Sequence, residues 1–422
     1  MKSFFLKLAV PFLLGLGILA SFSREVILAN FYGSTRNLEI YKIAFSIPYA
    51  FFQSLSTVLI GGLLPVLIAE GKECFYIIRT QIYKIFGFIA ILALLTVNQQ
   101  SSILAPGFKT EDLKILTLNL LICWIILIFS GLIFPLRLWL QDRDKKALIA
   151  STSLLFSFFY IVFIFFLHDR WLDFNLSLIS VTSAFLIYTT FSLACKACGL
   201  PQNSQTVKKN PNFKKKLNVI ILGAFIYVAL LAIPRLIDRA IASKMNDGVI
   251  ANLDYAMNFY VAFGVLIGTS FTIVSARKIA SEHKRNKLTL RWIFQVVGTP
   301  FLVALILIMF LLPFSDAIVK IAYMRGAFTE QDALQVSKML FWFLISLPVM
   351  VAGMLLSQIL VANSMHLLIG VALYKILGKL TWLFLFFKVN DLSVFGKSTL
   401  AMEAIGSIVM LIFLFMIKKN WQ

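Results

Sequence analysis

The chain is poor in acidic residues and in the side chains that bind metal ions. Its 422 residues include 19 aspartates and glutamates, four cysteines and three histidines. The histidines, His168, His283 and His366, are scattered along the sequence. Cys195 and Cys198 form one CxxC pair, which supplies only two of the four ligands of a structural zinc site. We therefore expect no metal site and interpret the cysteines as small apolar residues.

Long polar stretches are also scarce, which excludes a soluble globular protein. Hydrophobic residues make up 60% of the chain, and apolar runs long enough to cross a bilayer recur along its whole length. Because lipid offers no partners to backbone polar groups, only helices and closed barrels can span it. The runs are continuous rather than alternating, which favours helices. The sequence therefore predicts an all-α polytopic membrane protein.

The lengths of these runs predict about twelve transmembrane helices. They lie near residues 4–22, 40–68, 80–97, 115–136, 147–167, 175–195, 217–237, 252–275, 290–313, 335–361, 367–388 and 396–417. The first run is too long for the apolar region of a signal peptide and has no clear cleavage site. We therefore interpret it as the first transmembrane helix.

Lysines and arginines outnumber acidic residues, 39 against 19, which gives a net charge of +20. In a membrane protein, basic residues gather in cytoplasmic loops. The basic segments of this chain lie at 137–146, 208–216, 277–287 and 418–419, and all four fall on one side of the membrane if the helices alternate. We expect that side to be cytoplasmic, with both termini inside. The expected partner of these charges is the phospholipid bilayer rather than nucleic acid.

The segment 199–216 is the one clear linker, because it is polar and basic and contains two prolines. It divides the chain into lobes at 1–198 and 217–422, each with six predicted helices. Six crossings return a chain to the side where it started, so the two lobes have the same orientation. Transporters with such parallel repeats bind substrate in a central cavity between the lobes and alternate its access.

A short pattern recurs in the two lobes at an offset of 215 residues. The matching pairs are Arg24 and Arg239, Gly33 and Gly248, and the triplets Asn37-Leu38-Glu39 and Asn252-Leu253-Asp254. Each copy joins the end of the first helix of its lobe to the start of the second. The glycine permits a tight turn. The arginine and the carboxylate are either functional residues or a clamp that holds the turn.

Three segments resemble the signatures of one transporter family. They are SREVILANFYG followed by LEIYKIAFSIP (23–48), NLDYAMNFY (252–260) and YMRGAFTEQDA (323–333). In order and spacing they are similar to the MurJ/MviN lipid II flippases, over about residues 15–365. That family belongs to a superfamily that also includes O-antigen flippases and drug/sodium antiporters. The resemblance implies two six-helix lobes around a central cavity, in the inner membrane of a bacterium.

The chain departs from this family at two places. Where the family typically has two arginines beyond the proline of the second helix, the chain has Phe52 and Gln53. Where the family typically reads Ala-Asp-Arg in the eighth helix, it has Ala256, Met257 and Asn258. The resemblance therefore implies a flippase of undecaprenyl-diphosphate-linked sugars, with lipid II or a related cell-envelope glycolipid as the lipid-linked oligosaccharide substrate.

Seven residues are candidates for substrate binding, chosen from the repeat, the family signatures and the charges near helix ends. They are Arg24, Glu39, Lys42, Arg235, Arg239, Asn258 and Arg325. The basic members can hold a diphosphate through charge-assisted hydrogen bonds. Arg325 is equally compatible with an anchor at the membrane interface.

Three further charges, Lys375, Lys379 and Glu403, fall inside predicted membrane helices, where a charge is costly unless it is paired. The two lysines are four residues apart and share one helix face. Measured along ideal helices, Lys379 and Glu403 reach nearly the same depth. We therefore predict an ion pair between Lys379 and Glu403, either functional or structural.

No P-loop pattern G-x-x-x-x-G-K-[ST] occurs in the sequence, so an ATP-driven pump is not indicated. A membrane potential that is negative inside favours outward movement of an anionic lipid by about 2.3 kcal/mol per charge at 100 mV. We expect a secondary carrier rather than an enzyme, with no cofactor, driven by this potential or by a coupling ion.

Two other functions remain open. An ion-coupled exporter of amphiphilic cations would favour carboxylates in its cavity, whereas the charged candidates here are mostly basic. A non-transporting membrane scaffold for wall synthesis would explain the missing arginines.

Overall fold

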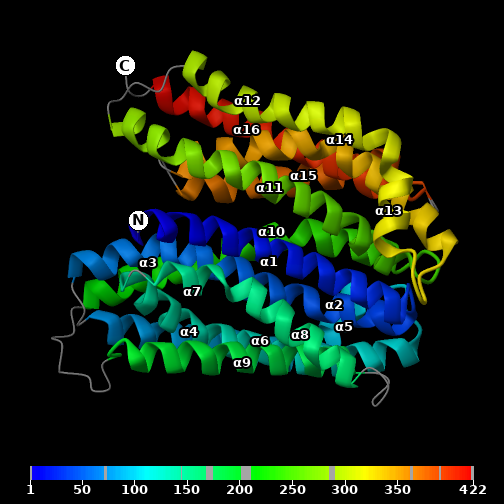
Figure 1. The fold of residues 1–422 in the computed structure, drawn as a ribbon, viewed down its shortest axis with the longest axis horizontal. Helices are drawn as coiled ribbons and strands as arrows, with labels where there is room; N and C mark the ends of the chain where they lie inside the picture. The colour runs from blue at the N-terminus through cyan, green and yellow to red at the C-terminus, as the bar shows by residue number, and fades with distance from the viewer. Residues whose placement is uncertain are drawn as a thin grey trace. The chain divides into compact units, whose positions relative to one another are not determined.

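The computed structural model describes residues 2–70, 74–143, 145–167, 174–200, 211–284, 290–361, 365–388 and 391–419, and the statements below concern these residues. Their regular secondary structure is entirely helical (Figure 1). Residues 201–210 of the predicted linker lie outside them, as does His168.

The helices follow one another along the chain with short connections. Those before the linker are α1 (Lys2–Tyr32), α2 (Arg36–Ala50), the π-helix η1 (Phe51–Leu55), α3 (Ser56–Glu70), α4 (Phe75–Leu95), α5 (Val97–Leu104), α6 (Thr110–Asp142), α7 (Lys146–Ala150), α8 (Thr152–Leu167) and α9 (Asn175–Ala197). Those after it are α10 (Pro211–Ala242), α11 (Val249–Lys284), α12 (Leu290–Leu311), the 3-10 helix η3 (Leu312–Phe314), α13 (Ser315–Tyr323), α14 (Glu330–Val361), α15 (Met365–Phe386) and α16 (Ser393–Lys419).

Eleven helical segments of the described chain are long and apolar enough to cross a membrane. A further helix, α8, is apolar but has only 16 residues. Each of the twelve predicted ranges overlaps one of these segments. This confirms the prediction of an all-α polytopic membrane protein.

Several helices are longer than predicted. The runs predicted to end at residues 22, 136 and 275 continue to Tyr32, Asp142 and Lys284 in α1, α6 and α11. A hydropathy window ends where charges begin, whereas a helix continues into the polar layer because its hydrogen bonds are internal. As a consequence, Arg24 and Glu25 lie within α1.

The second predicted helix is interrupted in its middle. Pro48 lies in α2, and a turn of π-helix, η1, separates α2 from α3. Proline lacks an N–H and crowds the preceding turn, and a π-bulge is a common way for a helix to continue past such a defect. In η1, Phe52 is buried and Gln53 is exposed.

Contacts divide the chain into two compact units. The first unit comprises Met1–Ile27, Arg36–Ala232 and Arg239–Lys244. Within it α6 packs against α2, α4 and α9 (Figure 1). Leu120 and Leu127 recur seven residues apart on the buried face of α6, the spacing of a helix that presents one stripe to a core.

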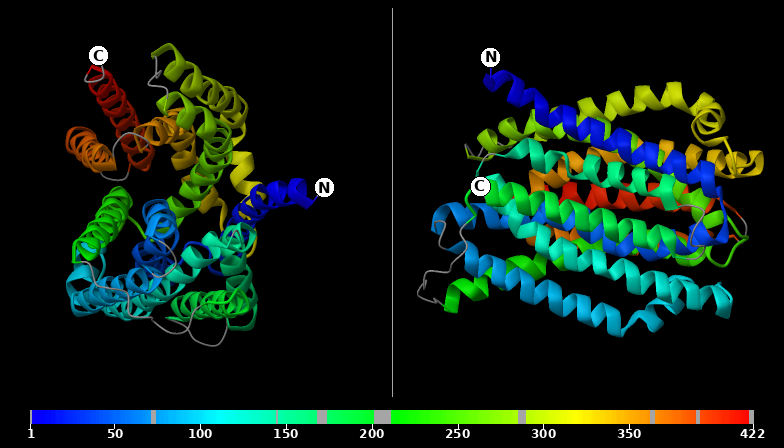
Figure 2. Two further views of the ribbon diagram at one scale, coloured as in Figure 1. Left: turned by 90° about the vertical axis from the view of Figure 1, so that its left-hand side faces the viewer. Right: turned by 60° about the horizontal axis from the view of Figure 1, so that its bottom comes forward.

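The second unit comprises Leu28–Thr35, Ile233–Asp238 and Met245–Gln422. Its central helix is α14, which packs against α11, α12 and α16. Leu340 and Leu347 on α14 are fully buried. α15 lies along α16, as two further views show (Figure 2).

The predicted division into lobes at 199–216 stays a prediction, and the contacts add a detail that it did not contain. α10 supplies residues to both units, and the residues around the turn after α1, 28–35, belong to the second unit. The chain therefore passes between the units several times.

Gly33 and Gly248, which the repeat aligns, both have positive φ, 56° and 89°. This left-handed region favours glycine, so both residues occupy turns as predicted. A Cβ on Gly33 would meet the carbonyl of Ala327, and one on Gly248 would lie 2.9 Å from Ser34 Oγ. Both turns therefore also need glycine for close packing.

The contact between α4 and α6 can be tested with two glycines. A Cβ added at Gly131 would lie 2.8 Å from Phe86 Cβ, whereas one added at Gly87 meets nothing within 4 Å. Gly131→Ala is expected to destabilise the protein by about 1–3 kcal/mol through overpacking. The control Gly87→Ala should be neutral or stabilising, because alanine is the better helix former by about 1 kcal/mol. Thermal unfolding in detergent measures both, and equal melting temperatures would contradict this packing.

Candidate functional site

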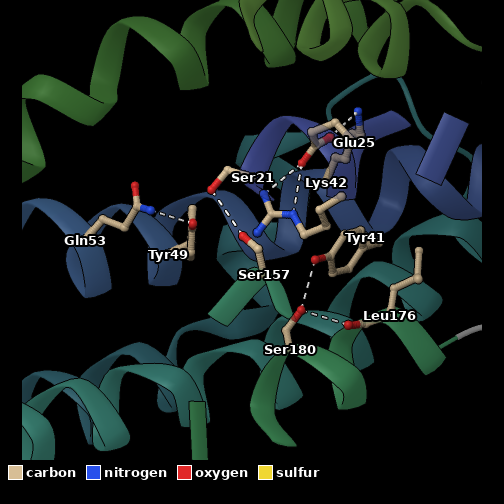
Figure 3. Close-up of polar contacts among 10 residues, drawn as sticks. Ser21, Glu25, Tyr41, Lys42, Tyr49, Gln53, Ser157, Leu176 and Ser180 are labelled. Carbon is tan, nitrogen blue, oxygen red and sulfur yellow. Dashed lines mark hydrogen bonds and ion pairs between the residues drawn. The ribbon is translucent and has the colours of Figure 1, made fainter. Parts of the chain in front are cut away.

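Three charged side chains form a buried cluster in the first unit: Arg24 and Glu25 on α1 and Lys42 on α2. Each is no more than 9% exposed. Arg24 donates to Glu25 Oε1 from Nη2 at 2.8 Å and from Nε at 3.3 Å. Lys42 Nζ lies 3.5 Å from the other oxygen, Glu25 Oε2 (Figure 3). Two cations thus share one carboxylate, which leaves the cluster with one net positive charge.

Four aromatic rings surround the guanidinium of Arg24. Its Cζ atom lies 5.4 Å from the ring centroids of Tyr49 and Tyr160 and 5.8 Å from those of Phe45 and Phe156. Rings at such distances stabilise a desolvated cation. The Nη1 atom of Arg24 is buried and has no hydrogen-bond partner among the described residues. The cage therefore holds a charge that retains donor capacity.

Phe52 and Gln53, the first of the two places where the chain departs from the family signatures, contribute to this cage. Gln53 Nε2 donates to the hydroxyl of Tyr49 at 2.6 Å (Figure 3). The ring of Phe52 lies 5.5 Å from that of Phe156 and 6.3 Å from that of Tyr49. Residues that replace the expected arginines thus support the aromatic wall around Arg24.

Glu39 forms a separate ion pair at the start of α2. Its Oε2 accepts from Arg36 Nη1 at 2.8 Å, and Arg36 Nε lies 3.6 Å from Asp112 on α6. Of the candidates on α1 and α2, the structure therefore joins Arg24 and Lys42 through Glu25 and gives Glu39 a different partner.

The remaining substrate-binding candidates are dispersed. Arg239 is buried in the first unit, whereas Arg235 is exposed and Asn258 half-buried in the second. Arg325 is exposed and donates from Nη2 to the carbonyl of Ile321 at 2.8 Å, as basic residues commonly do at the end of a helix. Their roles in substrate binding stay predictions.

α15 carries a buried lysine, Lys379, and a half-buried one, Lys375, each paired with a carboxylate within the second unit. Lys379 Nζ lies 2.6 Å from Asp238 Oδ2 on α10, and these side chains are only 1% and 2% exposed. Lys375 Nζ lies 2.6 Å from Glu403 Oε2 on α16. Glu403 thus pairs with a lysine of α15, as expected, but the predicted partner, Lys379, was wrong by one helical turn.

The physical reason is the start of α16. This helix begins at Ser393 rather than at the predicted residue 396, which places Glu403 about 4.5 Å further along the helix. That shift brings Glu403 level with Lys375 and leaves Lys379 available to Asp238. Depth estimates from sequence therefore failed by less than one turn of helix.

Asp332, at the start of α14, joins three parts of the second unit. Its Oδ1 accepts from Ser34 Oγ at 2.6 Å and from Asn252 Nδ2 at 3.1 Å. Its Oδ2 accepts from the backbone N–H of Thr329 at 2.9 Å and from Thr329 Oγ1 at 2.7 Å. Asp332 is thus the N3 residue of a capping box with Thr329 at the start of α14. It also links α14 to Ser34 and Asn252, which are distant in the sequence.

Two further contacts fasten the same parts together. The N–H of Ala327 donates to the carbonyl of Asn30 at 2.9 Å, and the hydroxyl of Tyr255 donates to the carbonyl of Gly33 at 2.8 Å. The three signature segments of the sequence therefore meet around the turn after α1. In this structure the three segments hold that turn in place.

Sequence analysis missed Glu25, Asp332 and the aromatic cage. Glu25 directly follows Arg24, and adjacent helix residues do not normally face each other, so the pair gave little signal. The cage did leave a signal in the sequence. Phe45 and Tyr49 are four residues apart and share a helix face, and so do Phe156 and Tyr160.

Long apolar helices whose buried charges are paired define a polytopic membrane protein. The comparisons narrow this class. The family model described as lipid II flippase MurJ matches residues 28–422, so the chain belongs to the lipid II flippase MurJ family. The resemblance found in the sequence is confirmed, and the family is one of transporters rather than of enzymes.

The chain is also similar to individual proteins of known sequence or structure. A probable lipid II flippase MurJ of Rickettsia prowazekii (strain Madrid E) is 26% identical over 359 residues, which cover 81% of this chain and 69% of the relative. A structure of lipid II flippase MurJ in an inward closed conformation is 19% identical, with a TM-score of 0.83, covering 97% of this chain and 87% of that one. An inward-facing multidrug resistance MATE family transporter of the MOP superfamily is 12% identical, with a TM-score of 0.71, covering 96% and 95%.

Double-mutant cycles test the two pairs of α15. Lys375→Met with Glu403→Gln, and Lys379→Met with Asp238→Asn, should each show a coupling energy of about 1–3 kcal/mol in thermal stability. Each single substitution leaves a buried charge unpaired. The mismatched combination, Lys379→Met with Glu403→Gln, should be additive. Coupling in this last cycle, with none in the first two, would support the pair predicted from the sequence, Lys379 with Glu403, and contradict the pairs in the structure.

Substitution of Asp332 tests the tie at the turn. In Asp332→Asn an amide N–H₂ replaces an oxygen that accepts hydrogen bonds, so about 1–3 kcal/mol of stability should be lost. The control Glu330→Gln lies two residues away and is exposed, and it should change the melting temperature little. Identical melting temperatures for the two variants would contradict a structural role for Asp332.

Proposed function

We propose that this protein is a lipid II flippase, which moves the undecaprenyl-diphosphate-linked sugar from the inner to the outer leaflet of the bacterial cytoplasmic membrane. The observation that carries this proposal is the match of the lipid II flippase MurJ family model to residues 28–422. The buried charges of the first unit supply the chemistry that such a substrate needs. They leave open a related lipid-linked glycan as the cargo.

Arg24 and Lys42 are the residues we assign to the diphosphate. Both are buried cations, and the Nη1 atom of Arg24 has no hydrogen-bond partner among the described residues, so it can donate to a phosphate oxygen. Phosphate oxygens can replace Glu25 as the acceptor, because Arg binds carboxylate and phosphate with the same fork of N–H groups. Glu25 would then hold both cations between transport cycles.

The cluster is closed to solvent in this structure, so a head group reaches it only after a conformational change. Alternating access provides that change, and the predicted central cavity and two lobes would provide the route. In the proposed orientation, both termini are cytoplasmic. Two charges moving outward at 100 mV would then gain about 4.6 kcal/mol from the potential.

Export of amphiphilic cations fits the buried carboxylates less well. Glu25, Asp238 and Glu403 are each paired with a lysine or arginine of the chain itself. Among the described residues no group of three or more histidine, cysteine, aspartate or glutamate side chains is placed to hold a metal ion.

The proposal is tested by rescue of a bacterium depleted of its own lipid II flippase. The wild-type chain should restore growth and the exposure of lipid II on the outer leaflet. Arg24→Ala should abolish both, and Arg24→Lys should retain only part, because it keeps the charge but loses the fork. The matched control is Arg79→Ala, whose guanidinium packs on Tyr76 at 4.8 Å, and it should rescue like wild type.

A folding defect is separated from a transport defect by a second variant. Arg24→Ala leaves Glu25 with Lys42 alone, whereas the triple substitution Arg24→Ala/Glu25→Gln/Lys42→Met removes all three buried charges and should keep the protein stable without restoring transport. Wild-type lipid II exposure with either variant would refute the assignment of Arg24. Failure of the folded wild-type chain to rescue would point to another lipid-linked glycan or to a scaffold.

A further inference from the structure

Two polar side chains are exposed in the middle of a membrane-spanning segment of the first unit. They are Gln53 and Ser54, and both lie in η1, halfway along the continuous helical segment that α2, η1 and α3 form. The apolar span that contains them runs from Arg36 to Leu64. An amide and a hydroxyl at this depth are costly in contact with hydrocarbon, because lipid offers them no hydrogen bonds. Polar side chains within a membrane protein therefore face its interior or a water-filled cavity.

The helix α4 shows what a surface that faces lipid looks like in the same unit. Every exposed side chain in its second half is large and apolar, namely Phe88, Ile91, Leu92 and Leu95. The pattern of η1 is the reverse, because its apolar residues are buried and its polar residues are exposed. The exposed side of η1 is therefore built to face water rather than lipid. Turns of π-helix of this kind occur frequently at functional sites.

Gln53 has hydrogen-bonding capacity that the protein does not use. A carboxamide has two N–H donors and a carbonyl acceptor. Gln53 uses one donor, which bonds to the hydroxyl of Tyr49 at 2.6 Å, and its carbonyl oxygen points away from Tyr49 (Figure 3). Among the described residues, no group bonds to that oxygen or to the hydroxyl of Ser54. One N–H, one carbonyl oxygen and one hydroxyl are thus available to a ligand.

Tyr49 connects these groups to the residue assigned to the diphosphate. Its ring centroid lies 5.4 Å from Cζ of Arg24, and its hydroxyl accepts the hydrogen bond from Gln53. The ring is also held without Gln53, because its centroid lies 4.4 Å from that of Phe45 and 5.2 Å from that of Phe156. A single side chain therefore contacts both the guanidinium and the carboxamide. The group attached to a diphosphate at Arg24 lies next to Gln53.

The exposed side chains of η1 suit a ligand that is uncharged and rich in hydrogen-bonding groups. At Phe52 and Gln53 the family signature has arginines, whereas this chain exposes an amide and a hydroxyl, which carry no charge. Both groups donate and accept, as do the hydroxyl and acetamido groups of a sugar. A diphosphate forms its strongest hydrogen bonds with cations, and a lipid tail forms none. Of the parts of a lipid-linked glycan, the sugar therefore matches η1.

We propose, on the basis of the function proposed above, that Gln53 and Ser54 form a subsite for the sugar attached directly to the diphosphate. Gln53 bonds to the sugar through its free N–H and its carbonyl oxygen, and Ser54 adds its hydroxyl. Tyr49 is a positioning residue, because its hydroxyl orients the carboxamide of Gln53. These residues favour the glycosylated lipid over the lipid diphosphate without a sugar.

The binding of two lipids to the purified full-length protein tests the proposal. They are undecaprenyl diphosphate and the same lipid carrying one N-acetylglucosamine, and native mass spectrometry gives a dissociation constant for each. Wild type should bind the glycosylated lipid about tenfold more tightly, as one or two additional hydrogen bonds predict. Gln53→Leu should remove most of this preference, whereas Arg24→Ala should weaken the binding of both lipids.

Two further variants separate the roles. Tyr49→Phe keeps the ring beside Arg24 but loses the hydroxyl that orients Gln53, so it should lose part of the preference for the sugar. The matched control is Gln99→Leu, which replaces an exposed glutamine of α5 in the same unit. This control should show the wild-type preference.

Three results would overturn the sugar subsite and leave the proposed function intact: equal binding of the two lipids by wild type, an unchanged preference in Gln53→Leu, or equal weakening of both lipids by Gln53→Leu. If wild type binds neither lipid, the proposed function fails and the subsite fails with it. Because Gln53 is exposed and two other rings hold that of Tyr49, Gln53→Leu should keep the wild-type melting temperature. A lost preference is then not a folding defect.

Discussion

A charge inside a bilayer needs a partner, and the arrangement of these helices depends on this constraint. Glu25 is shared by Arg24 and Lys42, Asp238 is held by Lys379, and Glu403 by Lys375. In water such pairs stabilise little, because solvent competes for each ion. In lipid there is no such competitor. A slip of one helix past another by a single turn would separate such an ion from its partner, so the contacts of Lys42 with Glu25, Lys379 with Asp238 and Lys375 with Glu403 each fix a register.

The fold was readable from the sequence because its signals are long and redundant. Apolar runs of bilayer length predicted the helices, and two glycines at one repeat offset predicted the turns at Gly33 and Gly248. The ion pairs were harder, because they depend on where a helix begins. An error of three residues at the start of α16 was enough to exchange Lys375 for Lys379 as the partner of Glu403.

The aromatic cage around Arg24 could be read from the sequence only as two separate pairs of rings, each on one helix face. Its rings come from α2 and α8, more than 100 residues apart in the chain, and only the packing of the first unit brings them to one guanidinium. Phe52 and Gln53, which looked like losses when compared with the family, prove to be parts of this wall. In this chain, aromatic and amide side chains stand where the family signature has two further arginines. Arg24 is therefore a buried cation surrounded by aromatic rings.

The tie at Asp332 has a consequence for the order in which the protein is made. Ser34 bonds to a residue that follows it by 298 positions. At the usual rate of synthesis, about 5–20 residues per second, the ribosome needs roughly 15–60 s to add that length of chain. During this interval the turn after α1 has already been synthesised. For most of it, neither Tyr255 nor Asp332 exists yet to form a hydrogen bond with the turn. One of the first turns to emerge is therefore among the last to become fixed, and the membrane itself must hold α1 in place until α14 arrives.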